Sequence, residues 1–463
     1  MGADWEAYSA GQLFDLINGY AFKSTDFKSS GVPIIKIKNV KAGEFVAENF
    51  DYVDRSFLES RPDKQVKPGD LLITMSGNRH DGSRETWVGK VAWFNKTENY
   101  LVNQRVGILR LKCSKSFNAR FLAYQLSSDA FQNHFIAVAT SSGGQANLSP
   151  SQITGMPLKV PCKAIQDRIA GILGALEDKI DLNRSTNQTL EAMAQAIFKS
   201  WFVDFDPVKA KIAAMQEGRS PLRAAMCAIS GKPDAELDAL PPEQYEQLAA
   251  TAALFPDEME ESELGETPKG WAFNSVAHIA QFASGKVDVS LLNEDIYVST
   301  ENMLGNRAGV TRATSLPSVA SVPSFKMGHI LISNIRPYFK KIWIARFDGG
   351  RSPDVLAFEP TDLQWAEFLY NLLYQDVFFE FMTRTAKGAK MPRGDKDAIM
   401  GWRFPCPDES LMVAFSEKVR PHYAHIESLV SQSKSLTELR DTLLPKLLSG
   451  ELSVVEAITG VEA

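Results

Sequence analysis

Cysteine and histidine are scarce in this chain, and neither residue type forms a recognisable site. The four cysteines stand far apart with no C-x-x-C pair, which excludes a disulfide framework and a cysteine-based zinc site. The six histidines are also scattered, and we interpret His422 and His425 as ordinary residues of an expected helix. We therefore expect reduced, mostly structural cysteines and no metal in this chain. The cysteines are Cys113, Cys162, Cys227 and Cys406.

Long apolar runs are absent as well. No stretch of roughly 18 apolar residues could span a bilayer, and the N-terminus lacks the basic start and apolar core of a signal peptide. We therefore expect a cytoplasmic protein. With 44% hydrophobic and 23% charged residues in 463 positions, the composition is that of an ordinary folded protein.

Motifs for catalysis and for nucleotide binding are missing too. The sequence has no N-P-P-[FY] or D-P-P-Y segment for methyl transfer, no G-x-x-x-x-G-K-[ST] phosphate loop and no H-E-x-x-H pair. The segment SGKPD at 230–234 lacks the first glycine and the hydroxyl residue of a phosphate loop. We therefore expect a non-catalytic chain with no cofactor of its own.

The acidic residues are unevenly spread along the chain, which has a net charge of -6. Residues 1–160 contain 19 Lys+Arg against 15 Asp+Glu, and residues 268–407 contain 16 against 13. The acidic excess lies in residues 204–267, with 14 acidic against 5 basic residues, and in residues 408–463, with 9 against 5. Two separate, mildly basic segments are thus available to meet phosphate groups.

What the sequence does contain is an internal duplication. The matching segments begin at Trp5 and Trp271, at Lys67 and Lys326, and at Pro161 and Pro407. The offset between the two copies falls from 266 to 259 and then to 246 along the chain. Because the first copy must hold extra residues, we place them in the loop NRHDGSRETW at 78–87.

Each copy consists of a mixed part followed by a long helix. Short apolar runs such as VPIIKIKNV alternate with helix-like segments, and no proline occurs from Cys162 to Val203. We predict a duplicated α+β protein whose two α+β domains are joined by a long two-helix coiled coil. The expected division is a first α+β domain at 1–160, a long helix at 161–203, an acidic linker at 204–267, a second α+β domain at 268–407, a second long helix at 408–450 and a tail at 451–463.

The two helices have an apolar seam with the 4,3 spacing of a heptad repeat. Helices of about 40 residues would be about 60 Å long, too long and too apolar along one stripe to stand alone. Asn183 and Asn187 lie on the seam, where they either fix the register or mark a wetter section. Pro421 and Pro445 should kink or end the second helix, so we expect its regular part at about 422–444. The expected seam residues are Leu176, Ile180, Asn183, Asn187, Leu190, Met193, Ile197, Trp201, His422, Ile426, Leu429, Leu436, Leu439, Leu443 and Leu447.

The direction of helix pairing is open from the residues themselves. Parallel pairing would put both α+β domains at one end of the coil, whereas antiparallel pairing would put one at each end. The link between Asp204 and Pro268 permits either, and its prolines and acidic runs suggest a surface excursion with one or two short helices.

The chain resembles the specificity subunit of type I restriction-modification systems over essentially its whole length. The resemblance is carried by KSWFVDFDPVKAK, LFPDEMEESELGETPKGW, LVNQRVGILRLK, SNIRPYFKKIWIA, SPDVLAFEP and LRDTLLPKLLSGEL, in this order around the duplication. It implies two target recognition domains, each for one half of a split asymmetric DNA site, and two helices that pair antiparallel as a ruler. It also implies two methyltransferase subunits as partners, and restriction subunits in a larger assembly. S-adenosylmethionine, and Mg²⁺ with ATP where a restriction subunit is present, would then belong to those partners. The long 204–267 link departs from the family pattern, which puts its contacts in doubt.

The segments after one framework strand of each copy are the first candidates for DNA contact. Arg and Asn can make paired hydrogen bonds to base edges, whereas Lys mainly contacts phosphate. An exposed turn with solvated charges is the alternative interpretation. The candidates are Ser76, Asn78, Arg79, His80 and Arg84 in the first copy and Asn334, Arg336, Tyr338, Lys340 and Lys341 in the second.

A second candidate cluster precedes each long helix, where glycine allows close approach to phosphate. A plain loop is the alternative for the first cluster, and four cations make phosphate contact the better interpretation of the second. Arg105 and Arg351 either contact DNA or close structural salt bridges, and Lys36, Lys38 and Asn39 alternate on an expected strand edge. The two clusters are Gly144, Gln145, Asn147 and Ser149, and Lys387, Lys390, Arg393 and Lys396.

Three functions are compatible with these patterns. The preferred one is a DNA-reading subunit of a methyltransferase and restriction complex. The second is a non-catalytic coiled-coil interaction scaffold without DNA sequence recognition, which would show no salt-dependent affinity for DNA. The third is an enzyme of unrecognised type, which would turn over a substrate without partners.

Overall fold

The computed structural model of the chain describes residues 5–142, 144–262 and 265–452. It divides into two compact units, one formed by the chain up to Leu182 together with the chain from Gln432 on, the other by Asn183–Ser431. No helix in the described ranges is both long and apolar enough to cross a membrane.

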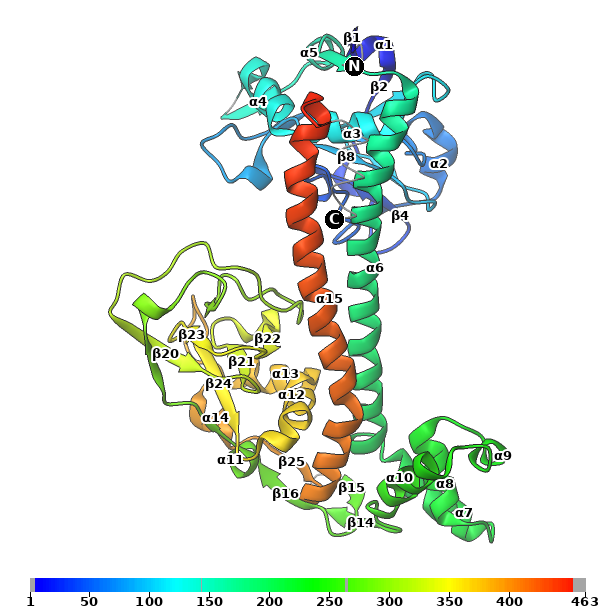
Figure 1. Ribbon diagram of the computed structural model, residues 1–463, viewed down its shortest axis with the longest axis vertical. Helices are drawn as coiled ribbons and strands as arrows, with labels where there is room; N and C mark the ends of the chain where they lie inside the picture. Colours follow the sequence, from blue (N-terminus) through cyan, green and yellow to red (C-terminus); the bar gives the residue numbers. More distant parts are fainter. Residues whose placement is uncertain (1–4, 143, 263–264, 453–463) are drawn as a thin grey trace. The chain divides into compact units, whose positions relative to one another are not determined.

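The first unit contains an α+β module, which we call module 1 (Figure 1). Strand β1 (Glu6–Ser9) pairs antiparallel with β13 (Pro157–Val160), so the two ends of the module lie together. The central sheet has the order β2-β10-β6-β8, with strands β2 (Phe14–Asn18), β10 (Val106–Leu111), β6 (Leu71–Thr74) and β8 (Val91–Trp93). A second sheet has the order β3-β5-β4-β9, with strands β3 (Phe27–Lys28), β5 (Asp51–Val53), β4 (Val32–Ile35) and β9 (Leu101–Val102).

Short helices complete module 1 and close its core. The apolar runs that predicted strands are buried, with Leu71, Leu72 and Ile73 all fully inaccessible to solvent. Asn118 caps the N-terminus of α3 by accepting a hydrogen bond from the backbone N–H of Phe121, which is why the helix begins there. The helices are α1 (Ala10–Leu13), α2 (Ser56–Ser60), α3 (Ala119–Ser127), α4 (Asp129–Val138) and α5 (Pro150–Thr154).

The second unit contains module 2, whose end-to-end strand pair and central sheet repeat those of module 1. Strand β16 (Ala272–Ser275) pairs antiparallel with β25 (Arg403–Cys406). The central sheet has the order β17-β24-β21-β22, with strands β17 (Ala280–Phe282), β24 (Val355–Pro360), β21 (Ile330–Ser333) and β22 (Ile342–Ile344). The second sheet joins β18 (Lys286–Asp288), β20 (Ser321–Phe325), β23 (Gly349–Arg351) and β19 (Tyr297–Val298). The helices are α11 (Val276–Ile279), α12 (Ala366–Tyr374), α13 (Asp376–Thr385) and α14 (Lys396–Met400).

The two modules confirm the predicted duplication. Strands β6 and β21 begin 259 residues apart, as the sequence match required. The first residues of β8 and β22 are 251 positions apart, and those of β10 and β24 are 249 positions apart. Of the 20 extra residues in the first copy, 8 therefore lie between β6 and β8, in the segment that contains the 78–87 loop, and 7 lie before β6.

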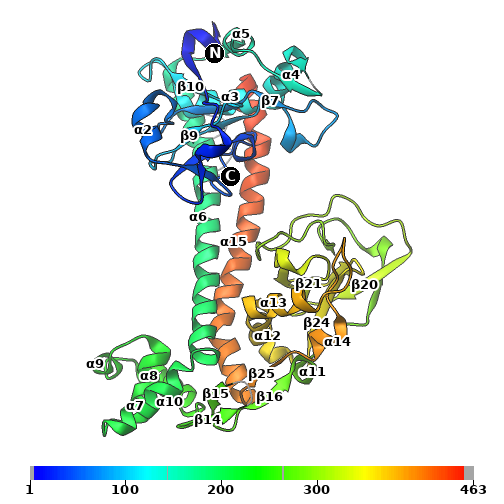
Figure 2. The ribbon, with the colours of Figure 1, turned by 180° about the vertical axis from the view of Figure 1, so that it is seen from behind.

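Two long helices, α6 (Lys163–Phe202) and α15 (Glu409–Ser449), run side by side in each unit (Figures 1 and 2). In the first unit, Ile169 and Leu173 of α6 share a core with Leu443 and Leu447 near the end of α15. In the second unit, the last turns of α6 share a core with the first turns of α15, where Phe198 meets Phe415 at 5.5 Å between ring centroids. The pairing is therefore antiparallel, and the predicted fold class is confirmed.

The expected seam residues differ in how deeply the structure buries them. Asn183, Trp201, Leu429, Leu443 and Leu447 are buried. Those that are half-buried are Leu176, Ile180, Asn187, Leu190, Ile197, His422, Ile426, Leu436 and Leu439. Met193 was placed on the seam wrongly, because its side chain is 47% exposed while that of Ala194 is buried.

The expectation that proline would shorten the second helix was wrong. Helix α15 continues through Pro421 and Pro445. Val419 and Tyr423 on either side of Pro421 are buried in the core, so tertiary packing holds the helix together where one backbone donor is missing.

The acidic linker is more structured than one or two short helices. It contains the hairpin β14 (Met259–Ser262) and β15 (Gly265–Pro268) and the helices α7 (Asp206–Gln216), α8 (Pro221–Ser230), α9 (Asp234–Leu237) and α10 (Pro242–Ala253). Val208, Met226 and Phe255 are buried in the same core as Trp201 and Trp271. Single apolar residues spaced between charges form this core, and the composition of the segment did not show it.

Candidate nucleic-acid interface

The two loops proposed to contact DNA in module 1 meet in one small sheet. Strand β7 (Ser76–Gly77) follows the framework strand β6, and the hairpin of β11 (Thr140–Ser142) and β12 (Gln145–Asn147) precedes α5. The sheet order is β11-β12-β7, and the Ser76 hydroxyl donates to Asn147 Oδ1 at 2.7 Å. We call residues 76–88, 140–142 and 144–149, together with Arg105, the first rim.

Arg105 joins the first rim through its backbone. Its carbonyl oxygen accepts a hydrogen bond from the Met75 N–H at 2.8 Å, and the Met75 carbonyl accepts from the Leu148 N–H at 2.9 Å. The side chain of Arg105 is exposed, and in the described part of the chain it forms no ion pair. A free guanidinium therefore stands beside the two loops.

The long loop of the first rim is held by internal hydrogen bonds. Asn78 Nδ2 donates to Thr86 Oγ1 at 3.0 Å, and Trp87 Nε1 donates to the Gly82 carbonyl oxygen at 2.8 Å. The ammonium of Lys90 lies beneath the loop and donates to the Glu85 carbonyl oxygen, and burial lowers the pKa of Lys90 to about 8. The loop is therefore an ordered surface rather than a loose excursion.

Some proposed contacts of the first rim are engaged within the protein. Arg79 donates to the carbonyl oxygen of Ala139, and Arg84 forms an ion pair with Asp129. Ser149 caps α5. The remaining candidates that are exposed or half-buried are Asn78, His80, Arg105, Gly144, Gln145 and Asn147.

Module 2 has an equivalent second rim, formed by residues 334–341 and 387–396 together with Asp354. Arg393 forms a backbone bridge with Ile335 and a paired backbone hydrogen bond with Lys387, at 2.8 and 2.9 Å. The backbone N–H of Arg336 donates to the Pro392 carbonyl oxygen at 2.8 Å. The two proposed loops therefore meet in this module as they do in module 1.

The second rim exposes apolar and cationic side chains. Arg336 has a left-handed backbone at φ 51° and an exposed side chain, and Tyr338 is 49% exposed. Lys390 is exposed and forms no ion pair within the described residues. Lys396 lies over the Phe282 ring at 5.9 Å, which leaves its ammonium near the surface.

Three lysines of the second rim are tied to the protein. Lys340 pairs with Asp376 at 2.7 Å, and hydrogen bonds from Lys340 and Arg307 lower the pKa of Asp376 to about 2. Lys341 donates to the Thr300 carbonyl oxygen at 2.6 Å, and Lys387 forms an ion pair with Asp395.

Four of the DNA-contact hypotheses need correction. Arg351 is 7% exposed because its guanidinium donates to the carbonyl oxygens of Ser324, Val355 and Ala283. Asn39 is 1% exposed and donates to two carbonyl oxygens of a neighbouring loop. Both residues have structural roles. Asn334 and Ser76 are also buried, so they support the rims from beneath.

Lys36 and Lys38 do not lie on a strand edge. Residues 37–39 form a short 3₁₀ turn after β4, and Lys36 pairs with Asp51 at 2.6 Å. Lys38 is exposed and lies 4.0 Å from the same carboxylate. Hydrogen bonding to Lys36 lowers the pKa of Asp51, so the two lysines flank a charged acid.

The backbone equivalence of the rims identifies a residue that the sequence match missed. The hydrogen bond from Met75 to Arg105 corresponds to that from the Asn334 N–H to the Asp354 carbonyl oxygen, also 2.8 Å. Asp354, rather than Arg351, is therefore the counterpart of Arg105. The connection between β21 and β24 is shorter than the one between β6 and β10, so the offset between the two copies changes to 249 at this point. A match at the offsets of the neighbouring segments therefore did not pair Arg105 with Asp354.

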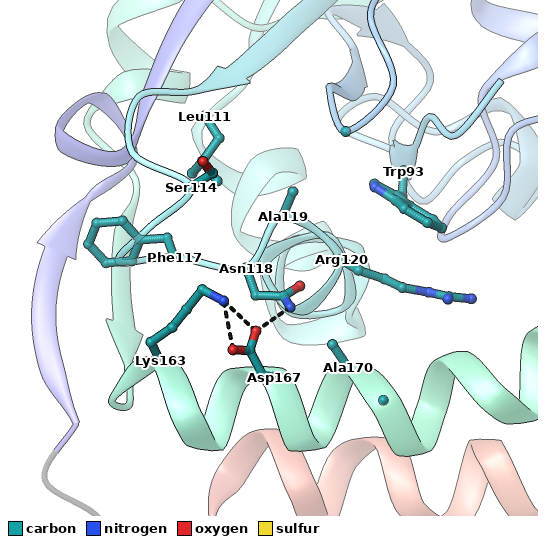
Figure 3. Close-up of a pocket in the computed structure, with 12 residues that line it drawn as sticks. Trp93, Leu111, Ser114, Phe117, Asn118, Ala119, Arg120, Lys163, Asp167 and Ala170 are labelled. Carbon is teal, nitrogen blue, oxygen red and sulfur yellow. Dashed lines mark hydrogen bonds and ion pairs between the residues drawn. The ribbon is translucent and has the colours of Figure 1, made fainter. Parts of the chain in front are cut away.

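A groove of about 500 Å³ lies in the first unit where α3 meets α6 (Figure 3). Lys163 pairs with Asp167 at 2.5 Å, and Asn118 Nδ2 donates to the same carboxylate at 2.7 Å. These hydrogen bonds, first from Asn118 and then from Lys163, lower the pKa of Asp167. The aromatic rings of Phe117 and Trp93 lie at the groove, so it combines charged and apolar side chains.

The chain has two copies of one fold, chemically unlike rims and an antiparallel helix pair. These features are typical of duplicated DNA-recognition proteins. A family model for the type I restriction modification DNA specificity domain matches residues 2–192. The chain is 30% identical to the type I restriction enzyme HindI specificity subunit of Haemophilus influenzae, over 97% of this chain and 100% of that relative. This chain belongs to the family of type I restriction enzyme specificity subunits, which recognise DNA sequence and are not catalytic.

Two further comparisons agree with this assignment. The EcoBI specificity subunit of Escherichia coli is 28% identical over 42% of this chain and 36% of that relative. The crystal structure of the type I restriction-modification S subunit from M. genitalium covers 96% of both chains with a TM-score of 0.51. At 16% identity, this similarity concerns the fold.

Proposed function

We propose that this specificity subunit reads a bipartite, asymmetric DNA site, one half with each module. Equivalent places on one duplicated scaffold carry different polar side chains, and this observation supports the proposal most directly. Binding to the DNA backbone alone would need no such difference, whereas two unlike half-sites need two unlike reading surfaces. The proposed division is 1–160 and 268–407 for the recognition domains, 161–203 and 408–450 for the spacer helices, 204–267 for the linker and 451–463 for a tail, most of which lies outside the described residues.

Side chains on the two rims make the proposed contacts with DNA. Arg, Asn and Gln can form paired hydrogen bonds with bases in the major groove, and Lys adds phosphate contacts that carry salt dependence. The proposed contacts are Asn78, His80, Arg105, Gly144, Gln145 and Asn147 in module 1 and Arg336, Tyr338, Lys390, Arg393 and Lys396 in module 2.

The paired helices α6 and α15 act as the spacer. Two half-sites about one helical turn apart present equivalent edges on one face of the duplex, at a separation of about 34 Å. A helix pair has few internal degrees of freedom, so its length sets which spacer between the half-sites is accepted.

The chemistry belongs to partner subunits. Two methyltransferase subunits dock on this chain in the cytoplasm, and a larger assembly forms where a restriction subunit is also present. S-adenosylmethionine is then held by the methyltransferase, and Mg²⁺ with ATP by a restriction subunit. The groove beside Asp167 offers a surface on α6 with both charged and apolar groups for such docking.

Methylation mapping of genomic DNA from the host tests this proposal. The expected result is one modified motif with two unlike half-sites and a fixed spacer, which disappears when the gene for this chain is deleted. An interaction scaffold without DNA recognition would leave the methylation pattern unchanged on deletion, and that result would refute the proposal.

A further inference from the structure

Asn147 and Arg393 occupy one and the same position in the two modules. Each is followed by a residue, Leu148 or Gly394, whose backbone N–H donates to the residue after the framework strand, Met75 or Asn334, at 2.9 and 3.2 Å. Asn147 forms a backbone bridge with Ser76, and Arg393 forms the equivalent one with Ile335. The duplicated scaffold thus presents one side chain from the same backbone site twice.

In module 2 this side chain is an arginine held by an acid. Arg393 Nη2 lies 3.0 Å from Asp354 Oδ1, and the arginine side chain is 55% exposed. The backbone of Asp354 is fixed by the hydrogen bond from Asn334 and by its own N–H, which donates to Ser352 Oγ at 3.3 Å. One edge of the guanidinium is therefore occupied, and the other N–H groups are left for a ligand.

The backbone around Arg393 is closely fitted. A Cβ at Gly394 would come within 2.7 Å of Asn334 Oδ1 and 2.9 Å of Ile399 Cδ1. Glycine at this position therefore lets the backbone segment that carries Arg393 lie directly against the end of β21. The arginine projects from a fixed base rather than from a mobile loop.

In module 1 the equivalent side chain is an asparagine held by a hydroxyl. Ser76 Oγ donates to Asn147 Oδ1 at 2.7 Å, and Asn147 Nδ2 donates to the Gln145 carbonyl oxygen at 3.4 Å. These contacts fix which end of the amide is the acceptor. One lone pair of Oδ1 and one N–H of Nδ2 are left for a ligand.

We propose that position 147/393 is a base-reading position of each module, with Asn147 reading an adenine in one half-site and Arg393 a guanine in the other. An amide matches the N6 donor and N7 acceptor of adenine, and a guanidinium matches the O6 and N7 acceptors of guanine. Ser76 and Asp354 are positioning residues that orient these side chains. The inference rests on the proposed function, because it names the bases that the two modules take.

The acid beside Arg393 distinguishes base reading from phosphate binding. A carboxylate at 3.0 Å lowers the positive potential of the arginine and would repel a phosphate group, so it weakens any contact made for charge alone. The same carboxylate orients the fork of the guanidinium, and orientation is what paired hydrogen bonds to one base require.

Base analogues in duplexes carrying the mapped site test the inference. Each guanine is replaced in turn by 7-deazaguanine and each adenine by 7-deazaadenine, which lack the N7 acceptor, and binding is measured with the full-length chain and its methyltransferase subunits. Wild type should lose about 10-fold in affinity at one guanine of one half-site and at one adenine of the other. Arg393→Ala should bind the unmodified site about 10-fold more weakly and become insensitive to the guanine analogue, and Asn147→Ala should do the same for the adenine analogue.

The positioning residues give a second readout. Asp354→Asn should lower the ratio of cognate to scrambled affinity several-fold while raising affinity for scrambled DNA, because a negative charge is removed. Glu294→Gln is the matched control, since Glu294 pairs with Arg312 at 3.2 Å in the same module but outside the second rim. It should leave the ratio unchanged, and thermal unfolding of each variant checks that it is folded.

Results of two kinds, from the duplexes and from the positioning variant, would overturn the inference and leave the proposed function standing. One is analogue sensitivity that persists in Arg393→Ala or Asn147→Ala, or a half-site without the expected purine. The other is an unchanged cognate-to-scrambled ratio in Asp354→Asn. If wild type bound mapped and scrambled duplexes equally, the proposed function itself would fail.

Discussion

The side-chain amide of Asn183 on α6 donates to the backbone carbonyl oxygen of Leu429 on α15 at 3.4 Å, and these two residues occupy the same position in the two copies of the repeat, 246 residues apart. In an antiparallel pair of duplicated helices, equivalent positions meet at the middle of the pair. Asn183 is 1% exposed there, so a buried polar residue marks the centre of a mostly apolar seam.

Replacing Asn183 by leucine should stabilise the helix pair. Removing a buried amide from a hydrophobic seam is expected to raise the free energy of unfolding by about 1 kcal/mol, with a looser register as the consequence. Urea unfolding followed by tryptophan fluorescence measures the change. Gln188→Leu, at an exposed position of the same helix, controls for the added apolar surface. A drop in stability would show that the amide contributes more through hydrogen bonding than it costs in burial.

Heptad spacing predicted the helix pair but not the width of its buried face. The alternating 4,3 spacing selects Ala194, which is buried, rather than Met193, which is 47% exposed, but Phe198, which is off that pattern, is also only 1% exposed. The reason is a third neighbour, since the ring of Phe198 lies 5.6 Å from that of Phe368 on α12 of module 2. A two-helix pattern cannot show a face that a separate domain covers.

The candidate site was predictable where the two copies align without gaps. The loops after β6 and β21 and the loops before α5 and α14 follow from the repeat, and the structure brings them together as two rims. Asp354 was missed because the offset changes by ten residues between β6 and β10. Only the backbone hydrogen bonds of the strands show which residues are equivalent across such a gap.

Glu191 on α6 should make the second unit less stable as pH rises. Burial raises the pKa of Glu191 to about 7, although a hydrogen bond from the Tyr370 hydroxyl at 3.1 Å and the charges of Arg346 and Arg307 oppose the shift. A carboxyl whose pKa is raised on folding contributes its full stability below its unfolded pKa of about 4.5, and this contribution is lost as pH rises through 7.

Glu191→Gln should therefore be more stable than wild type at pH 8 by about 2 kcal/mol and nearly equal to it at pH 5. Denaturant midpoints at the two pH values measure the difference. Glu417→Gln removes one negative charge from an exposed position of α15 and serves as the control. An equal gain at both pH values would mean that packing, rather than ionisation, separates the glutamine variant from wild type.

Arg336 and Lys390 should respond differently to alanine substitution. Arg336→Ala is expected to lose about 1 to 3 kcal/mol at the cognate site only, because a base contact is specific. Lys390→Ala should weaken binding to all sequences alike and reduce the salt dependence by about one phosphate contact. Binding titrations at several salt concentrations with cognate and scrambled duplexes separate the two effects. Equal losses on both duplexes for Arg336→Ala would exclude base reading by that residue.

Pro421 should limit the stability of α15. It is exposed and lies inside a helix that continues from Glu409 to Ser449, so the carbonyl oxygen four residues earlier lacks its helical donor. Pro421→Ala should raise the free energy of unfolding by about 1 to 3 kcal/mol. Thermal unfolding measures this gain, and Pro445→Ala should act in the same direction on the other half of the helix. A fall in the melting temperature would mean that the proline ring makes packing contacts that outweigh the missing hydrogen bond.

Lengthening both spacer helices by one heptad should change the spacer of the DNA site and leave the half-sites unchanged. Seven residues add about 10 Å to a helix and preserve the seam, because a heptad returns each residue to the same face. Insertion after Leu182 in α6 and after Ser431 in α15 places the extra turns where the two compact units divide, outside both rims. Methylation mapping of a strain carrying this variant is expected to return the same two half-sites with a longer gap. The same insertion in α6 alone is the control, since it shifts one helix against the other and should abolish modification. A variant that methylated the original site with its original gap would show that the helix pair does not set the distance between the half-sites.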